Sequence, residues 1–223
     1  MGASEPRIRV TRDGAYEVSG DVPLARTAKI ETEFGEPIGW APDDAIDVGP
    51  SYELCRCGRS STKPFCDGTH RVVPFQGGET ADRGPRASRA RTFRGEGVVM
   101  TDDRTLCEHA GHCGDRFTDV WRMIRETADP AVRDRLCRMV SLCPSGSLES
   151  APDATSPSVE PDYVPCVAVV RDGPLWVRGG IPIESADGTT YEVRNRVTLC
   201  RCGRSGNKPF CDGSHAPAGF RDG

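Results

Sequence analysis

One sixteen-residue stretch occurs twice in this chain of 223 residues, as CRCGRSSTKPFCDGTH at 55–70 and as CRCGRSGNKPFCDGSH at 200–215. Each copy places three cysteines and one histidine in the pattern C-x-C-x8-C-x3-H, with no insertion between the copies. Glycine, proline and serine separate these residues and allow the backbone to fold back on itself. Four ligands can therefore surround one metal centre. Zinc suits this ligand set, and so does an iron–sulfur cluster.

Both copies match C-x-C-x2-S-x3-P-x-C-D-G-S/T-H, which resembles the motif of the CDGSH iron–sulfur domain family. The resemblance implies one 2Fe–2S cluster in each copy, held by three cysteines and one histidine. The implied ligands are Cys55, Cys57, Cys66 and His70 in the first copy and Cys200, Cys202, Cys211 and His215 in the second. The motif residues expected beside the ligands are Ser60, Asp67, Ser205 and Asp212. A zinc-bound interaction module is the alternative.

The repeat extends upstream of the ligands. Apolar and polar residues alternate around Asp13-Gly14 in residues 8–24 and around Asp172-Gly173 in residues 167–183. Alternation about an Asp-Gly pair predicts a β-hairpin in each unit. Each unit is thus expected to hold a few strands, a ligand loop and one short helix.

Two details of these units can be predicted from the sequence. Asp67 and Asp212 follow the third cysteine, where an aspartate can cap the start of the short helix. The first unit has 30 residues between Leu24 and Cys55, against 16 at the equivalent place in the second. This excess, centred on Trp40, predicts a surface insertion.

A third module is predicted at 95–149. Cys107 and Cys113 have five residues between them, and Cys143-Pro144 follows a helix predicted to start at Asp129-Pro130. A cysteine pair and a later Cys-Pro are typical of ferredoxin clusters. The stretch resembles divergent single-cluster ferredoxin domains.

The ligands implied for the central cluster are Cys107, Cys113 and Cys143. A 3Fe–4S cluster needs only these three, whereas a 4Fe–4S cluster needs a fourth ligand. The candidates are His109, His112, Cys137 and an exogenous group. Either histidine can instead donate a hydrogen bond to cluster sulfide.

The predicted fold class is small α+β, with two β-rich outer modules around a ferredoxin-like insert. The predicted segments are a first module at 1–76, a linker at 77–94, the central module at 95–149, a linker at 150–162 and a second module at 163–223. The CDGSH family, which the two motifs resemble, builds its cluster sites as intertwined homodimers. Two copies in one chain therefore imply an internal pseudo-dimer. We therefore expect a monomer with an approximate two-fold axis; a homodimer is the alternative.

Composition and the N-terminal sequence argue against several classes of protein. The eleven cysteines are odd in number and lie in short groups, which predicts metal ligation in a reducing compartment rather than a disulfide framework. The start MGASEPRIRV contains no secretory signal, so a cytoplasmic protein is expected. No apolar run approaches the ~20 residues needed to span a bilayer. A net charge of −4 argues against a nucleic-acid partner.

The sequence contains no phosphate-binding loop, nucleophile elbow or dinucleotide fingerprint, so no enzyme is predicted. The predicted function is electron transfer with a redox partner protein, through two 2Fe–2S clusters and one 3Fe–4S or 4Fe–4S cluster. Iron–sulfur cluster storage, cluster transfer or redox sensing is the alternative. A histidine ligand raises the potential of a cluster and can be released by protonation, so His70 and His215 are expected to make both sites sensitive to pH.

Overall fold

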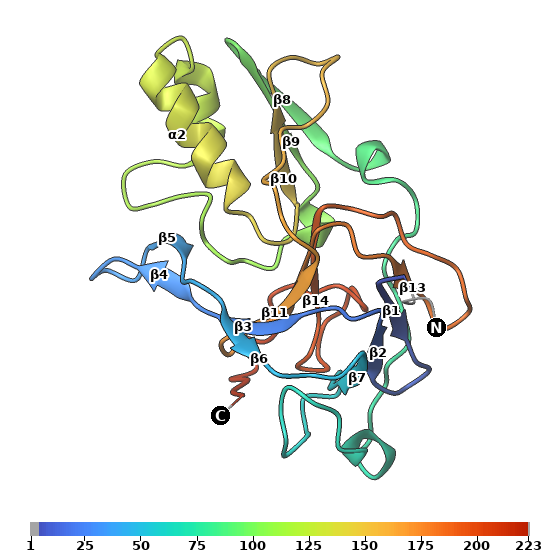
Figure 1. The fold of residues 1–223 in the computed structure, drawn as a ribbon. Coiled ribbons are helices and arrows are strands. Elements are labelled where there is room, and N and C mark those ends of the chain that lie inside the picture. The colour runs from blue at the N-terminus through green and yellow to red at the C-terminus, as the bar shows by residue number, and fades with distance from the viewer. Residues whose placement is uncertain (1–4, 223) are drawn as a thin grey trace.

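A computed structural model describes residues 5–222. The chain is mostly β-structure with a few short helices, arranged in two larger sheets and a smaller layer (Figure 1). No helix among residues 5–222 is long and apolar enough to cross a bilayer.

The first sheet has the strand order β13-β1-β2-β7. Its strands are β1 (Arg7–Val10), β2 (Tyr16–Ser19), β7 (Ser51–Leu54) and β13 (Ile183–Glu184). The second sheet has the order β14-β12-β11-β3-β6. Its strands are β3 (Leu24–Thr27), β6 (Asp44–Ile46), β11 (Cys166–Val170), β12 (Leu175–Arg178) and β14 (Arg196–Leu199). The hairpins β1–β2 and β11–β12 confirm the two predicted around Asp-Gly pairs.

The two repeats exchange strands between the sheets: β13 of the second repeat joins the first sheet, and β3 and β6 of the first repeat join the second sheet. β3 comes from the first repeat and pairs in parallel with β11 of the second, with Leu24 opposite Val167. The equivalent strand of the second repeat, β13, pairs in parallel with β1, with Ile183 opposite Ile8. Each sheet thus contains the third strand of the other repeat, and neither repeat completes a sheet by itself.

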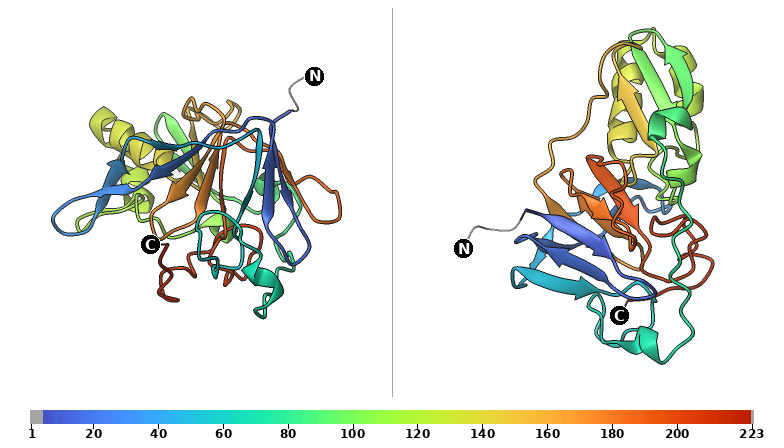
Figure 2. Two further views of the ribbon diagram at one scale, coloured as in Figure 1. Left: turned by 60° about the horizontal axis from the view of Figure 1, so that its bottom comes forward. Right: turned by 90° about the vertical axis from the view of Figure 1, so that its right-hand side faces the viewer.

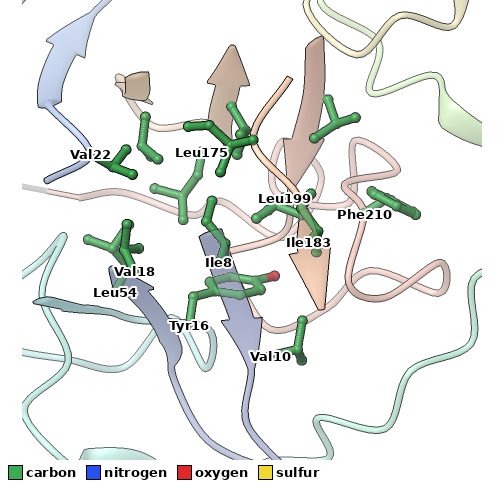
Figure 3. Close-up of a cluster of buried hydrophobic side chains, with 14 of the residues drawn as sticks. Ile8, Val10, Tyr16, Val18, Val22, Leu54, Leu175, Ile183, Leu199 and Phe210 are labelled. Atoms are coloured by element: carbon green, nitrogen blue, oxygen red, sulfur yellow. The ribbon is translucent and has the colours of Figure 1, made fainter. Parts of the chain in front are cut away.

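One hydrophobic core lies between the two sheets. Alternate residues of β1 and β2 point inward, as the strand period of two requires, and meet apolar residues of β11, β12 and β14. Figure 3 shows side chains of both repeats pointing toward one another. Fully buried members of this core are Ile8, Val10, Tyr16, Val18, Leu175 and Leu199. The shared core fixes the positions of the two ligand loops, which follow β7 and β14 directly.

The central module forms a separate layer above the two larger sheets (Figures 1 and 2). Its sheet has the order β10-β9-β8, from strands β8 (Arg91–Gly95), β9 (Val98–Asp102) and β10 (Leu148–Ala151). Helices α1 (Val120–Met123) and α2 (Pro130–Ser141) pack against this sheet through their own apolar core. The Asp129 carboxylate accepts a hydrogen bond from the Ala131 amide with Pro130 as the first helical residue, which confirms the predicted start of α2.

The short helix predicted after the third cysteine is present in the first unit as a 3-10 helix at Thr69–Arg71, whereas residues 211–222 of the second unit contain no helix. Gly68 occupies the cap position of that 3-10 helix, and the Asp67 carboxylate accepts a hydrogen bond from the Thr69 amide at 3.0 Å. The Asp212 carboxylate accepts the equivalent hydrogen bond from the Ser214 amide, also at 3.0 Å. The two aspartates therefore bind the predicted amides, but no α-helix directly follows either motif.

The insertion in the first repeat is not an inert surface loop. It contains the hairpin of β4 (Lys29–Glu31) and β5 (Pro37–Trp40), which reaches the central module. The Trp40 Nε1 donates to the Leu142 carbonyl at 3.0 Å, and the Lys29 Nζ donates to the Ala110 carbonyl at 3.3 Å. The Trp40 ring also contacts Trp176 of the second repeat. The hairpin therefore joins three parts of the chain.

The segment 77–94, predicted to be a linker, makes specific contacts. Thr80 and Ala81 donate backbone hydrogen bonds to the Lys208 carbonyl, at 2.8 and 2.9 Å. The buried Arg86 pairs with Glu149 at 3.0 Å, and β8 starts inside this range. The segment thus helps to hold the central module on the second repeat.

Candidate metal centres

The eight predicted ligands of the two motifs lie in pairs. In the first motif, the Cys55 and Cys57 sulfurs are 3.7 Å apart, and the Cys66 sulfur lies 3.4 Å from the His70 Nδ1. The second motif repeats both distances, 3.7 Å between the Cys200 and Cys202 sulfurs and 3.4 Å between the Cys211 sulfur and the His215 Nδ1. Two donors on one tetrahedral metal, each about 2.3 Å from it, stand about 3.8 Å apart. Each pair therefore has the spacing that one metal ion requires.

The two pairs of a motif do not converge on a single ion. Within residues 5–222, one trio of cysteine, histidine or carboxylate ligand atoms lies within 4.8 Å of one another, and it is Glu108, Cys211 and His215. A single tetrahedral zinc would bring all four donors of a motif within about 4 Å of one another. Two pairs, each with metal spacing and held apart, instead fit a centre of two metals. The donor geometry thus favours a 2Fe–2S cluster over one zinc ion.

The motif serines and aspartates shape the ligand loops. The Ser60 and Ser205 hydroxyls donate to the carbonyls of Phe65 and Phe210, both at 2.7 Å. The Asp67 carboxylate accepts hydrogen bonds from the Ser61 and Thr69 amides at 2.8 and 3.0 Å. The Thr69 side chain and these two amides hold the pKa of Asp67 below its usual range. The equivalent Asp212 accepts hydrogen bonds from the Gly206 and Ser214 amides at 2.7 and 3.0 Å. These residues close each loop around its ligands.

Two arginines of the motifs have a structural role that the sequence did not indicate. Arg56 and Arg201 are each 2% exposed. The Arg56 guanidinium donates to the Gly14 carbonyl at 3.4 Å, and the Arg201 Nε donates to the equivalent Gly173 carbonyl at 2.7 Å. Each motif is thereby fastened to the hairpin turn of its own repeat. Arg201 also pairs with the buried Asp222 at 2.6 Å.

The two ligand loops touch each other at equivalent positions. A Cβ on Gly58 would lie 2.6 Å from the Cys202 carbonyl oxygen, and a Cβ on Gly203 would lie 2.7 Å from the Cys57 carbonyl oxygen. An open cleft of about 520 Å³ lies beside this contact. Its lining includes the ligands Cys57 and Cys202 and the cations Arg59, Arg204 and Lys208. Both motifs are therefore reached from one basic cleft.

The three cysteines predicted for the central cluster line one pocket of about 200 Å³. Cys107 follows the 3-10 turn Arg104–Leu106, where the Asp103 carboxylate accepts from the Thr105 amide, and Cys143 follows α2. Burial, together with the neighbouring Cys143 and Cys107 thiols, raises the pKa of Cys113 to about 11. Burial also raises the pKa of Cys107. The sulfurs of the three cysteines do not gather within 4.8 Å, so the pocket fits a cluster rather than one ion.

Of the predicted fourth ligands, Cys137 lies outside this pocket, in a different depression beside Arg133 and Val159. His109 and His112 both line the pocket. His109 is exposed, whereas His112 is buried, and burial lowers the pKa of His112 to about 4. Sulfide donation by either histidine stays a prediction.

Glu108 joins the central pocket to the second motif, and nothing in the sequence pattern singled it out. Its side chain is buried, with a carboxylate oxygen within 4.8 Å of the Cys211 sulfur and a His215 ring nitrogen. Burial raises the pKa of Glu108 to about 8. Nearby, the Asn207 Nδ2 donates to the Thr105 carbonyl at 2.7 Å. The second motif is thus covered by the central ligand loop, so that Cys211 is 2% exposed whereas Cys66 is half-buried.

Comparison with curated proteins and with solved structures finds no match for this chain. Two family descriptions match it. The iron-binding zinc finger of CDGSH type matches residues 13–71 and 172–216, and the divergent 4Fe-4S mono-cluster matches residues 93–152. Domains of the first family bind 2Fe–2S clusters, and those of the second bind one 4Fe–4S cluster. The chain therefore carries two iron-binding CDGSH regions on either side of a divergent 4Fe–4S mono-cluster domain.

Proposed function

We propose that this protein transfers electrons through three iron–sulfur centres, one in each CDGSH motif and one in the central domain. The observation that carries this proposal is the series of contacts between the loops that hold the three ligand sets. When bound, such a cluster accepts and releases single electrons at a potential set by its ligands and surroundings. The rest of the proposal concerns the residues that hold and connect the sites.

The proposed ligands are those indicated by the motifs. Cys55, Cys57, Cys66 and His70 form the first site, Cys200, Cys202, Cys211 and His215 the second, and Cys107, Cys113 and Cys143 the central one. All eleven cysteines are free thiols in the structure, and ten of them belong to these sites or to α2. This usage supports a reducing compartment, as predicted.

The three sites follow one another through space. The first and second touch where Gly58 and Gly203 meet the opposite cysteine carbonyls. The second and central sites touch where Glu108 approaches Cys211, one residue from the ligand Cys107. Hydrogen bonds within and between these loops support the spatial order first, second, central. A fixed order of closely spaced sites suits an internal electron relay.

The reciprocal exchange of β3 and β13 supports an internal pseudo-dimer, in which the two repeats stand in for two subunits. On this proposal the chain is a monomer. The solution mass from light scattering should equal that of one chain, 24.1 kDa. A mass of two chains, with each site shared between them, would instead indicate a homodimer.

The basic cleft between the motifs supports a redox partner with an acidic surface. Arg59, Arg204 and Lys208 line the cleft next to the ligands Cys57 and Cys202. Opposite charges at this place would steer an acidic protein toward both sites, with a rate that falls as salt screens them.

Cluster transfer or sensing is the second candidate, and the exposure of the first motif favours it. His70 and His215 are both half-buried, but Cys66 is half-buried whereas Cys211 is 2% exposed. A ligand histidine that solvent reaches can be protonated and released. A cluster at the first motif is therefore the one available to an acceptor protein.

One experiment separates the two candidates. The anaerobically purified protein is titrated with reductant while electron paramagnetic resonance records each centre, and is then mixed with a metal-free acceptor ferredoxin. Electron transfer predicts reversible reduction of all three centres with no loss of iron to the acceptor. Transfer of iron and sulfide to the acceptor favours the second candidate, and a protein without reducible centres contradicts both.

A further inference from the structure

We propose that His112 is the fourth ligand of the central site, so that three cysteines and one histidine hold a 4Fe–4S cluster there. This inference rests on the proposed iron–sulfur function. It begins with a buried side chain that lacks a well-formed polar partner. His112 is 3% exposed, and within residues 5–222 no hydrogen bond of good geometry reaches either ring nitrogen, although the Pro37 backbone lies close by. Burying such a group without a well-formed partner is unfavourable, so a bound partner is expected.

The pocket beside this imidazole contains the three cysteine ligands. His112 lines the same space of about 200 Å³ as Cys107, Cys113 and Cys143. Histidine is a common metal ligand, and it replaces cysteine at iron in other iron–sulfur proteins. The orphaned ring nitrogens and the thiols therefore border one space of the kind that a cluster occupies.

The ring is held in place by the neighbouring module. The Trp40 ring packs on it with centroids 4.8 Å apart, and the Trp40 Nε1 is fixed by the Leu142 carbonyl. Gly111, just before His112, has a φ of +95° and packs under Pro37 of the same hairpin, with 3.0 Å between its ideal Cβ position and the Pro37 Cγ. Metal-binding histidines commonly need such support, because their orientation decides which nitrogen is offered.

The other candidates for the fourth ligand of the central site are less suitably placed. Cys137 does not line the central pocket and lies in a different depression, beside Arg133 and Val159. His109 is exposed, with its Cδ2 2.8 Å from the position of an ideal Cβ on Gly213 of the second motif. The Glu108 carboxylate lies beside Cys211 and His215. His112 is thus the buried donor that remains at the central pocket.

The test compares the wild-type protein with His112→Cys, His112→Ala and the control Cys137→Ala. Iron per chain is measured together with frozen-solution Mössbauer and electron paramagnetic resonance spectra. We expect His112→Ala to lose one iron per chain and to yield the paramagnetic oxidised three-iron form. His112→Cys is expected to keep four irons at a lower potential, because thiolate adds negative charge. Cys137→Ala should match the wild type.

A direct readout uses nitrogen hyperfine coupling in the reduced central cluster. In a His70→Cys, His215→Cys background the two motif histidines no longer contribute, so a remaining histidine coupling belongs to the central site. We expect that coupling to vanish when His112→Cys is added. Its persistence, or a four-iron central cluster in His112→Ala at the wild-type potential, would overturn the role of His112. A wild-type protein that binds zinc in place of iron would overturn the proposed function itself.

Discussion

Gly58 and Gly203 occupy equivalent positions in the two motifs, and each lies against the carbonyl oxygen of the other motif's second cysteine. Their φ angles are +75° and +77°, a region that favours glycine. An added Cβ would stand 2.6 Å from the Cys202 oxygen at Gly58 and 2.7 Å from the Cys57 oxygen at Gly203. The close approach of the two motifs therefore requires a residue without a side chain at both positions.

Gly203→Ala should destabilise the protein by about 2–4 kcal/mol, because strain at positive φ adds to a backbone clash. Thermal unfolding and iron content at both motifs provide the measurement. Gly188→Ala is the matched control, with φ at +86° and nothing within 4 Å of its Cβ position, and should cost about 1 kcal/mol. Equal losses of unfolding free energy in the two variants would show that the contact between the motifs does not contribute to stability.

Arg201→Met should destabilise the chain by about 3–5 kcal/mol, because it leaves the buried Asp222 without its charged partner and the Gly173 carbonyl without its donor. Chemical denaturation measures this loss. The exposed Arg204, three residues away, is the control, since Arg204→Met removes a charge from the basic cleft without breaking a buried pair. We expect a change of at most about 0.5 kcal/mol there. A comparable loss in both variants contradicts the anchoring role.

Acid should weaken the second motif through His215. Burial lowers the pKa of this histidine from 6.5, so the folded chain binds a proton less readily than the unfolded one. The unfolded state then holds more protons below about pH 6.5, and stability falls as the pH falls through this range. His215→Cys removes that proton site. We expect its cluster absorbance to persist to lower pH and its reduction potential to fall, whereas an unchanged pH profile and potential would contradict a ligand role.

Trp40→Ala should loosen the central module by about 3 kcal/mol, because it removes the packing on His112 and Trp176 and the hydrogen bond to Leu142. Hydrogen exchange of β9 and α2 and the loss of central-cluster absorbance measure this effect. Ile38→Ala on the same hairpin is the control, since its side chain is 60% exposed and lies outside these contacts. If both variants behave alike, the hairpin does not secure the central module.

Much of the site was predictable because its ligands lie close together in sequence. The spacing from Cys55 to His70 defines a loop, and the Asp-Gly turns define the hairpins before it. The start of α2 was also predictable, since Asp129-Pro130 is a local signal. These features depend on contacts between near neighbours in the chain.

Other features depend on contacts that spacing does not encode. The exchange of β3 and β13 pairs strands more than 140 residues apart. Glu108 lies beside Cys211 and His215 of the second motif only because the central module folds onto the second repeat. Trp40 was expected in a surface insertion, yet it stacks on His112 more than 70 residues away. The short helix predicted after each third cysteine is limited to one 3-10 helix, at Thr69–Arg71, because glycine and proline follow both motifs closely.

The most direct test of the account is the metal content of anaerobically purified protein, with iron, acid-labile sulfide and zinc measured on the sample that gives the visible spectrum. We predict a red-brown protein with about eight irons per chain, two at each CDGSH motif and four at the central site. A colourless protein with two zinc ions per chain and no labile sulfide would contradict it.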